Sequence, residues 1–309
     1  MRNGRDLRNA VIHTLAFFWI YNLPVHRRRL FELLYKCRAK ENEVYWELEK
    51  MVVEKQIIRR GDLYSLDHWD NEHFRQNLEE SDKRWKKVYL YAWILSILPF
   101  LEYVAVINSL AIGSADKESD IDFFVITKSD CLYFCRSLII VVFKLLNIYK
   151  TRIHVRERFS FGYYITTKHL DLSELTLYDD PYLAFWFASH APIIGLNIYK
   201  QFTKSNTWIY KYFPNYDSSF REKYFYKERR SIIKLKTILE KLLSIPVTLF
   251  EPLIRYIHVR HTFNLPENHW PTSSTIADKN ILKLHAIDNR KDLRKMFYEI
   301  LAKSGKVIQ

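Results

Sequence analysis

The sequence predicts an α+β protein with three parts: a helical N-terminal domain over residues 1–68, a core built on a mixed sheet over 69–170, and a mainly helical C-terminal region over 171–309. Three observations predict this arrangement. Apolar residues recur at helical spacing early in the chain, two apolar runs rich in β-branched residues lie at 101–107 and 121–127, and a basic amphipathic segment follows at 221–243. With 309 residues, of which 48% are hydrophobic, the chain is long enough to bury a core without covalent cross-links.

The N-terminal domain is predicted to contain three helices and a hairpin. Val11, Leu15 and Phe18 stand at i, i+4 and i+7, and similar apolar sets follow later in the domain. Two short β-prone runs, 57–59 and 63–66, then flank the residues Arg-Gly-Asp, which favour a tight turn. Three helices followed by a hairpin is the order of a winged-helix domain, so we expect a winged-helix-like fold over residues 1–68.

A winged helix often reads DNA, but the charge of the third predicted helix argues against that role here. This helix would enter the major groove, where phosphates repel carboxylates. Against one internal lysine it carries five acids, Glu41, Glu43, Glu47, Glu49 and Glu54. We therefore expect a structural role or a protein contact, while Arg27, Arg28 and Arg29 on the second helix keep DNA binding open as the alternative.

The core is predicted to hold one long connecting helix and a small sheet. The apolar runs at 101–107 and 121–127 lack alternation, which is typical of strands buried on both faces. In chain order we expect a helix at 70–98, strands at 101–107 and 121–127, a helix at 132–147, and strands at 153–157 and 161–166. Together these elements form a mixed sheet with flanking helices.

The C-terminal region is predicted to be mainly helical. Its clearest element is the basic helix at 221–243, in which Ile232, Leu235, Leu239 and Leu242 form the apolar stripe and which Pro246 is expected to end. Eight basic residues against three acids within 221–241 suit a nucleic-acid backbone, although a solvated helix face has the same composition. A short strand at 281–285 and a helix at 291–303 close the chain.

Charge and cysteine content limit the partners and the compartment. The formal net charge of +13 favours an anionic partner, either a nucleic acid or the phosphates of a nucleotide, although it is also compatible with a merely solvated surface. Three cysteines are too few for a disulfide framework, and Cys131 and Cys135 are expected to be buried apolar residues. Without a leader or a spanning segment in the sequence, we expect a cytoplasmic protein with no membrane partner.

Two carboxylates are the main candidates for chemistry. Asp120 and Asp122 are separated by one residue at the start of the apolar run 121–127, so their side chains point to the same face of a strand. Two neighbouring acids at a buried strand need compensation, and Mg²⁺ prefers carboxylate and phosphate oxygens. The plainer alternative is that both acids cap a strand edge in water.

The turn before these acids strengthens the functional interpretation. Ser109, Ala111, Gly113 and Ser119 stand at fixed offsets before Asp120, and small residues in such a turn let backbone amides approach a phosphate. The stretch 106–127 resembles the signature of the DNA polymerase beta superfamily of nucleotidyltransferases. It is most similar to the small bacterial and archaeal domains, whose motif reads Gly-Ser-x-Ala-x-Gly followed by Ser-Asp-Ile-Asp. The resemblance covers residues 100–166, and Asn108 stands where the family has glycine.

The resemblance implies a set of roles. Asn108, Ser109, Gly113 and Ser119 would form the nucleotide-binding turn, and Asp120 and Asp122 would hold up to two Mg²⁺ ions. The family usually takes a third carboxylate from a later strand, and Glu157 is the candidate because it shares its parity with Ile153 and Val155 in the predicted strand. The alternative for Glu157 is a surface residue paired with Arg156 or Arg158.

The implied activity is transfer of a nucleoside monophosphate from a nucleoside triphosphate to an acceptor, with catalytic residues Asp120, Asp122 and Glu157. The acceptor stays open among RNA, protein and small molecules. Asn108 and the third carboxylate make a second function possible, in which the chain is a weakly active or inactive nucleotide-binding sensor whose winged helix contacts DNA or a protein partner.

Overall fold

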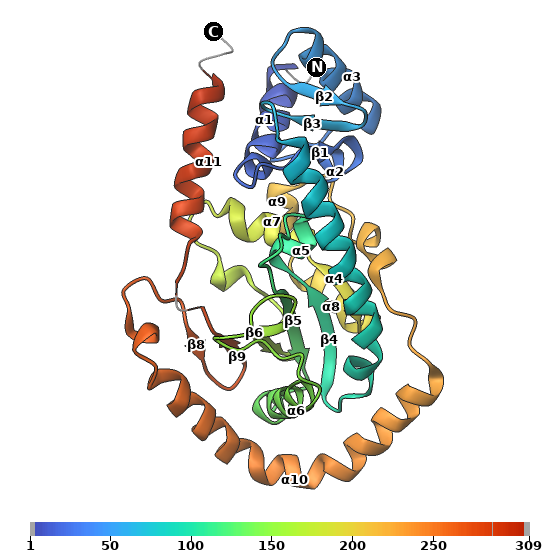
Figure 1. The fold of residues 1–309 in the computed structure, drawn as a ribbon, viewed down its shortest axis with the longest axis vertical. Coiled ribbons are helices and arrows are strands. Elements are labelled where there is room, and N and C mark those ends of the chain that lie inside the picture. The colour runs from blue at the N-terminus through green and yellow to red at the C-terminus, as the bar shows by residue number, and fades with distance from the viewer. Residues whose placement is uncertain (1–3, 286, 306–309) are drawn as a thin grey trace.

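The computed structural model describes residues 4–285 and 287–305, and its N-terminal part confirms the predicted three helices and hairpin (Figure 1). The elements are α1 (Gly4–Trp19), β1 (Val25–His26), α2 (Arg27–Glu32), α3 (Glu41–Val53), β2 (Ile58–Arg60) and β3 (Leu63–Ser65). The strand β1 was not predicted, because two residues are too few to show the alternation of a strand. It completes a three-stranded antiparallel sheet in the order β1-β3-β2.

Helix α4 (Asn71–Ile97) confirms the predicted connecting helix. The Asp70 carboxylate accepts hydrogen bonds from the backbone N–H groups of Glu72 and His73, which otherwise lack partners at a helix start. From there α4 runs along the molecule from the N-terminal part to the far end of the central sheet (Figure 1). It therefore spans both parts and can position residues in each.

The central sheet has six strands in the order β7-β4-β5-β6-β9-β8. The predicted strands at 101–107 and 121–127 are confirmed as β4 (Leu101–Val106) and β5 (Ile121–Thr127), which pair antiparallel, while β5 and β6 (Phe159–Thr166) pair parallel. Both faces are buried as predicted: Phe124 and Ile126 belong to one hydrophobic core, and Phe123 and Val125 belong to the other. The sheet is thus the middle layer of the molecule.

The predicted strand at 153–157 was wrong. Those residues form a loop, and the strand β6 begins only at Phe159. Glu157 lies in a turn with a φ of 54°, which no regular strand allows. The alternating charged and apolar residues of 152–158 resembled a half-buried strand, but they belong to a largely exposed loop, in which Ile153 is 87% exposed.

The C-terminal region is mainly helical, as predicted, but it also completes the central sheet. Its elements are α7 (Pro181–Ser189), β7 (Ala191–Ile194), α8 (Leu196–Ser205), α9 (Ile209–Tyr212), α10 (Arg230–Phe263), β8 (Ile276–Ala277), β9 (Ile281–Lys283) and α11 (Arg290–Gly305), with short 3₁₀ turns between them. The predicted last strand and last helix correspond to β9 and α11. Three strands therefore join the sheet from beyond the predicted boundary at residue 170.

Gly195 shows why the unpredicted strand β7 can turn directly into α8. Its φ is 86°, in the left-handed region that favours glycine. A Cβ atom at this position would lie 2.0 Å from the carbonyl oxygen of Glu102 on β4. Only glycine lets the chain pass this close to the neighbouring strand.

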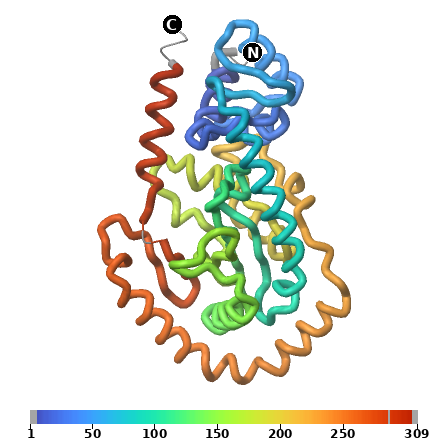
Figure 2. The backbone as a smooth tube through the Cα atoms, viewed as in Figure 1, coloured from blue at the N-terminus to red at the C-terminus, as the bar shows by residue number. Residues whose placement is uncertain are grey.

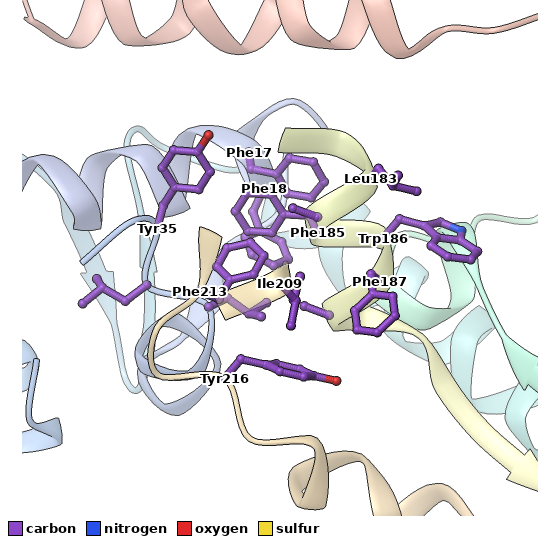
Figure 3. Close-up of a cluster of buried hydrophobic side chains, with 14 of the residues drawn as sticks. Phe17, Phe18, Tyr35, Leu183, Phe185, Trp186, Phe187, Ile209, Phe213 and Tyr216 are labelled. Carbon is purple, nitrogen blue, oxygen red and sulfur yellow. The ribbon is translucent and has the colours of Figure 1, made fainter. Parts of the chain in front are cut away.

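The N-terminal part is joined to the C-terminal helices by a shared aromatic core (Figure 3). The rings of Phe17 on α1 and Phe185 on α7 stack with centroids 3.8 Å apart, and Phe213 after α9 packs edge-on against Phe185. Buried aromatic pairs of this kind contribute about 0.5–1.5 kcal/mol beyond their buried area. The N-terminal part is therefore anchored to the helices that flank the sheet.

Helix α10 corrects the prediction for the C-terminal region. It begins at Arg230 instead of 221, and it continues through Pro246 and Pro252 to Phe263. A proline removes one hydrogen bond and bends a helix, and the chain here tolerates both prolines in a helix that curves around one end of the molecule (Figure 2). The predicted apolar stripe is also not a buried face, because Leu235 and Leu242 are exposed.

Candidate functional site

Asp120 and Asp122 lie at the start of β5, between β4 and β6 in the middle of the sheet. Asp122 has the same parity as Phe124 and Ile126, so it belongs to the sheet face that the N-terminal part and α7 cover. The side chain of Asp120 is 14% exposed. The predicted pair is thus placed at a strand start beside a buried core.

The surroundings of Asp122 disfavour the negatively charged form of its carboxylate. Burial, and then repulsion from Asp120, raise the pKa of Asp122 above its usual value. Hydrogen bonds from Asn108 and Ser160 oppose this rise, and the Asn108 Nδ2 atom donates to Asp122 Oδ2 at 2.8 Å. A buried acid pair of this kind is stabilised by a cation.

Lys150 supplies such a cation and was missed by the sequence analysis. Its Nζ atom lies 2.5 Å from Asp120 Oδ2, and although burial favours the neutral amine, Asp120 and Asp122 outweigh it and raise the pKa of Lys150. The backbone N–H of Lys150 donates to the carbonyl of Phe159, which ties this residue to the start of β6. No local pattern signals Lys150, because its loop is brought to the acids only by the sheet.

The turn between β4 and β5 contains the short helix α5 (Asn108–Ile112). Asn108 adopts a φ of 56°, in the left-handed region that asparagine tolerates better than most residues. At the other end, Gly113 has a φ of 87°, and the carbonyl of Ser109 accepts from the N–H groups of Gly113 and Ser114 at 2.9 and 2.8 Å. These bonds give the turn a defined shape around Ser109.

Ser119 belongs to a second tight turn just before Asp120. Its hydroxyl donates to Asp116 Oδ1 at 2.7 Å and accepts from the backbone N–H of Asp116 at 3.0 Å. The hydrogen bonds that the Asp116 carboxylate accepts from the Ser119 hydroxyl and from the Glu118 N–H lower the pKa of Asp116. In this arrangement the hydroxyl of Ser119 shapes the loop.

Arg84 on α4 binds this loop through hydrogen bonds from its guanidinium. Its side chain is fully buried, and its guanidinium donates to the carbonyls of Ser119 and Lys117 and to the carbonyl and carboxylate of Glu80. The Arg84–Glu80 ion pair has an N–O distance of 2.8 Å. A planar guanidinium fits several carbonyls at fixed angles, so Arg84 fixes where the strand with both acids begins.

The N-terminal part also contacts the turn. Arg29 on α2 donates to the carbonyls of Ile112 and Ala111 at 2.9 and 3.3 Å, at the C-terminal end of α5. Burial, and then the charge of Arg221, lower the pKa of Arg29 to about 10. The N-terminal part is therefore joined to the turn that contains the predicted nucleotide-binding residues Asn108, Ser109 and Gly113.

A cavity of about 280 Å³ opens beside the turn. Three of the four predicted nucleotide-binding residues, Asn108, Ser109 and Ser119, line it, and its wall also includes the aromatic residues Tyr21, Tyr182 and Trp186. Burial, and then the charge of Asp122, raise the pKa of Tyr182 to about 12, which places this wall within electrostatic reach of the acids.

A second cavity of about 380 Å³ shares these three aromatic residues in its lining. Its lining includes Lys283, His285 and Arg290, together with Asp288. Burial, and then Arg290, lower the pKa of Lys283 to about 8. Sequence analysis missed this basic wall because β9 and the start of α11 lie more than 150 residues beyond the acids.

Glu157 does not join the acid pair. In the described part of the chain, no three His, Cys, Asp or Glu side chains form a group that could hold a metal ion. The Glu157 carboxylate lies 4.0 Å from the guanidinium of Arg156, and its backbone N–H donates to the carbonyl of Ser119. The residue that pairs with Asp122 on β6 is Ser160, so no acid occupies the neighbouring position of that strand.

Comparison with protein-family models, with curated proteins and with solved structures gives no match to this chain. Within residues 4–285 and 287–305, no helix combines the length and the apolar character that crossing a bilayer requires. The function therefore has to be inferred from the residues and the geometry of the site.

Proposed function

We propose that the chain is a Mg²⁺-dependent nucleotidyltransferase that transfers a nucleoside monophosphate from a nucleoside triphosphate to an acceptor. The observation that carries this proposal is the hydrogen bond from Asn108 to Asp122, which joins the acid pair to a cavity that Asn108, Ser109 and aromatic residues line, although neither acid lines it. Carboxylates, a tight turn and aromatic rings are the groups that metal-bound phosphates and a base require. The family resemblance of residues 100–166 supports the same assignment.

The acid pair suits Mg²⁺ in the chemistry of its donors. Asp120 and Asp122 would hold the ion, and the raised pKa of Asp122 reflects a site where a nearby positive charge is stabilising. When bound, Mg²⁺ would neutralise charge on the phosphates of the nucleotide. Lys150, which pairs with Asp120, would contact a phosphate oxygen.

The remaining residues would position the substrate. Ser109 and the turn around it would hold the phosphates, while Tyr182 or Trp186 would stack on the base in the cavity. An acceptor oxygen then attacks the α-phosphorus, the bond between the α and β phosphates breaks, and pyrophosphate leaves. Holding both reactants in line contributes much of the rate in such transfers.

The N-terminal part fits a winged-helix-like domain, which we assign a structural and partner-contact role. Its helix α3 exposes Glu41, Glu43, Glu49 and Glu54, which repel a DNA backbone. By contrast, Arg29 and Phe17 connect it to the turn and to α7. A cytoplasmic location fits the burial of Cys131 and Cys135, which behave as apolar core residues.

A second candidate is a nucleotide-binding sensor without turnover. It is favoured by one specific arrangement: Ser160 stands opposite Asp122, and Lys150 already compensates Asp120. In that case the site binds a nucleotide, and the N-terminal part transmits binding to a partner through Arg29. The two candidates differ in whether nucleotide is consumed.

The first experiment is a transfer assay in the presence and absence of Mg²⁺. The purified chain is incubated with each α-labelled nucleoside triphosphate and with cell RNA, cell protein or a small-molecule extract. We expect labelled acceptor with Mg²⁺ and none after chelation with EDTA. The control is the Asp120→Asn/Asp122→Asn double variant, purified in the same way, which detects contaminating enzymes. Nucleotide binding without transfer would support the sensor, and neither binding nor transfer would refute both candidates.

Tyr182→Ala is expected to weaken nucleotide binding about 10-fold, because base stacking on an aromatic ring contributes about 1–3 kcal/mol. Tyr182 lies in the wall that both cavities share and is partly exposed to them. A titration with a fluorescent nucleotide measures the dissociation constant. The matched control is Tyr182→Phe, which keeps the ring and should bind like the wild type. Equal binding by all three proteins would exclude stacking on Tyr182 and would leave Trp186 as the remaining candidate.

A further inference from the structure

Helix α10 is the largest element outside the candidate site, and it is apolar on its outer face as well as on the inner face, where Val247 is buried in the core. It is 34 residues long, which corresponds to about 50 Å at the usual rise per residue. It follows an arc around the end of the molecule opposite the N-terminal part, beside α6 (Leu132–Leu145) and the end of α4 (Figure 1).

The inner face of α10 contributes polar groups to the rest of the fold. Glu251 accepts hydrogen bonds from the backbone N–H groups of Tyr133 and Phe134 at 2.9 and 2.7 Å, and so caps the start of α6. Glu240 accepts from the N–H of Phe100 at 2.9 Å, just before β4. These specific bonds fix the rotation of α10 about its axis.

The outer face of α10, opposite these two glutamates, is apolar. Its residues follow one another at intervals of four, three, four, four and three, which is a single stripe along an α-helix. They are Ile238, Leu242, Ile245, Leu249, Leu253 and Tyr256, with exposed fractions between 54% and 71%. A contiguous apolar surface of this length marks a contact with another apolar medium.

The charges of α10 indicate which medium that is. The helix carries six Lys or Arg residues and two carboxylates. Both carboxylates, Glu240 and Glu251, face inward and accept backbone hydrogen bonds, so the outer face has basic residues but no acid. Lys234, Lys241 and Arg260 are exposed along this side. An apolar stripe flanked by lysine and arginine is complementary to a surface with anionic headgroups over hydrocarbon.

The curvature of α10 favours a lipid surface over a second copy of the chain as the partner of this stripe. The arc of α10 is convex away from the molecule (Figure 1), and the exposed stripe lies opposite the inward-facing Glu240 and Glu251, so two such helices would touch over only a short length. A lipid interface deforms around a convex surface. The two helices that α10 contacts also carry exposed apolar residues, with Leu145 of α6 80% exposed and Trp93 of α4 47% exposed.

We propose that the outer face of α10 binds the surface of a bilayer that contains anionic lipids, with the helix lying in the interface. The expectation of no membrane partner rested on the absence of a segment long enough to span a bilayer, and interfacial binding needs no such segment. The proposal is independent of the nucleotidyltransferase assignment, because none of its residues belongs to the acid pair or to either cavity beside it.

Cosedimentation of the full chain with vesicles tests the proposal. We expect binding to vesicles of mixed phosphatidylcholine and phosphatidylglycerol, and much weaker binding to phosphatidylcholine alone. The double variant Leu242→Glu/Leu249→Glu should not bind, because it places two carboxylates in the stripe. Lys234→Gln/Lys241→Gln should bind the anionic vesicles about 30-fold more weakly, at about 1 kcal/mol for each lysine near the surface.

The matched control is Val53→Glu/Leu78→Glu, which introduces the same charges at exposed apolar residues of α3 and of the early part of α4, far from α10 (Figure 1). It should bind vesicles like the wild type. Thermal unfolding followed by circular dichroism verifies that every variant is folded. The proposal is overturned if the wild type binds neither kind of vesicle. It is also overturned if light scattering shows a wild-type dimer that the Leu242→Glu/Leu249→Glu variant dissociates.

Discussion

Asp122→Asn is expected to lower nucleotidyl transfer by about 10²–10³-fold, the loss seen when one preorganised electrostatic contact to a transition state is removed. The substitution keeps the size of the side chain and the oxygen that accepts from Asn108 Nδ2, so the turn should persist. What it removes is one of the two negative charges that would hold Mg²⁺. The measurement is the initial rate of label transfer at saturating nucleotide and Mg²⁺.

The control for this prediction is Asp130→Asn, which makes the same chemical change just beyond the other end of β5. Asp130 is exposed and paired with Lys168, so its loss should leave the transfer rate unchanged. Undiminished transfer by Asp122→Asn would contradict the assignment of the metal site. Lost transfer with unchanged nucleotide binding would show that the charge acts in the chemical step more than in substrate affinity.

Arg84→Met is expected to lower the free energy of unfolding by about 3–5 kcal/mol, the cost of removing one partner from a buried ion pair. The Arg84 side chain is fully buried, and its loss leaves Glu80 and the carbonyls of Ser119 and Lys117 without their donor. Urea unfolding measures the change. The loop that leads into Asp120 should loosen as well, so nucleotide binding should fall together with stability.

The stabilisation by the Arg84–Glu80 ion pair also depends on pH. Ion pairs with Lys83 and then with Arg84 lower the pKa of Glu80 from 4.5 to about 2. A carboxylate with a lowered pKa in the folded state stabilises the fold above its unfolded pKa, and this contribution is lost as the pH falls toward the folded value. The difference between the wild type and Arg84→Met should therefore be constant near neutral pH and shrink between about pH 4.5 and 2.

Arg75→Met is the matched control on the same helix. Arg75 is 61% exposed and pairs with Glu72 and Glu79 in water, so its replacement should change stability far less than Arg84→Met does. If both variants lost the same stability, the effect would come from helix α4 in general. If Arg84→Met lost none, the buried contacts to the Ser119 loop would not support the site.

Much of the fold could be predicted because its signals are local. The apolar runs of β4 and β5 indicated burial on both faces, and both strands lie in the middle of the sheet. The bounds of α4 and α6 were predicted to within two residues, whereas those of α10, the helix predicted from its apolar stripe, were not. The strand at 153–157 was wrong because a loop with alternating charges has the same period as a half-buried strand.

The sequence by itself determined where the two carboxylates lie, because a strand start and a spacing of two residues are properties of adjacent residues. Only the tertiary structure decided what surrounds them. Lys150, Arg84 and Tyr182 each lie about 30 or more residues from the acids and reach them through the sheet and α4. The outward rotation of the α10 stripe is set in the same way, by Glu251 bonding to α6 across 117 and 118 residues of sequence. Such contacts follow from packing the whole chain, which no local pattern encodes.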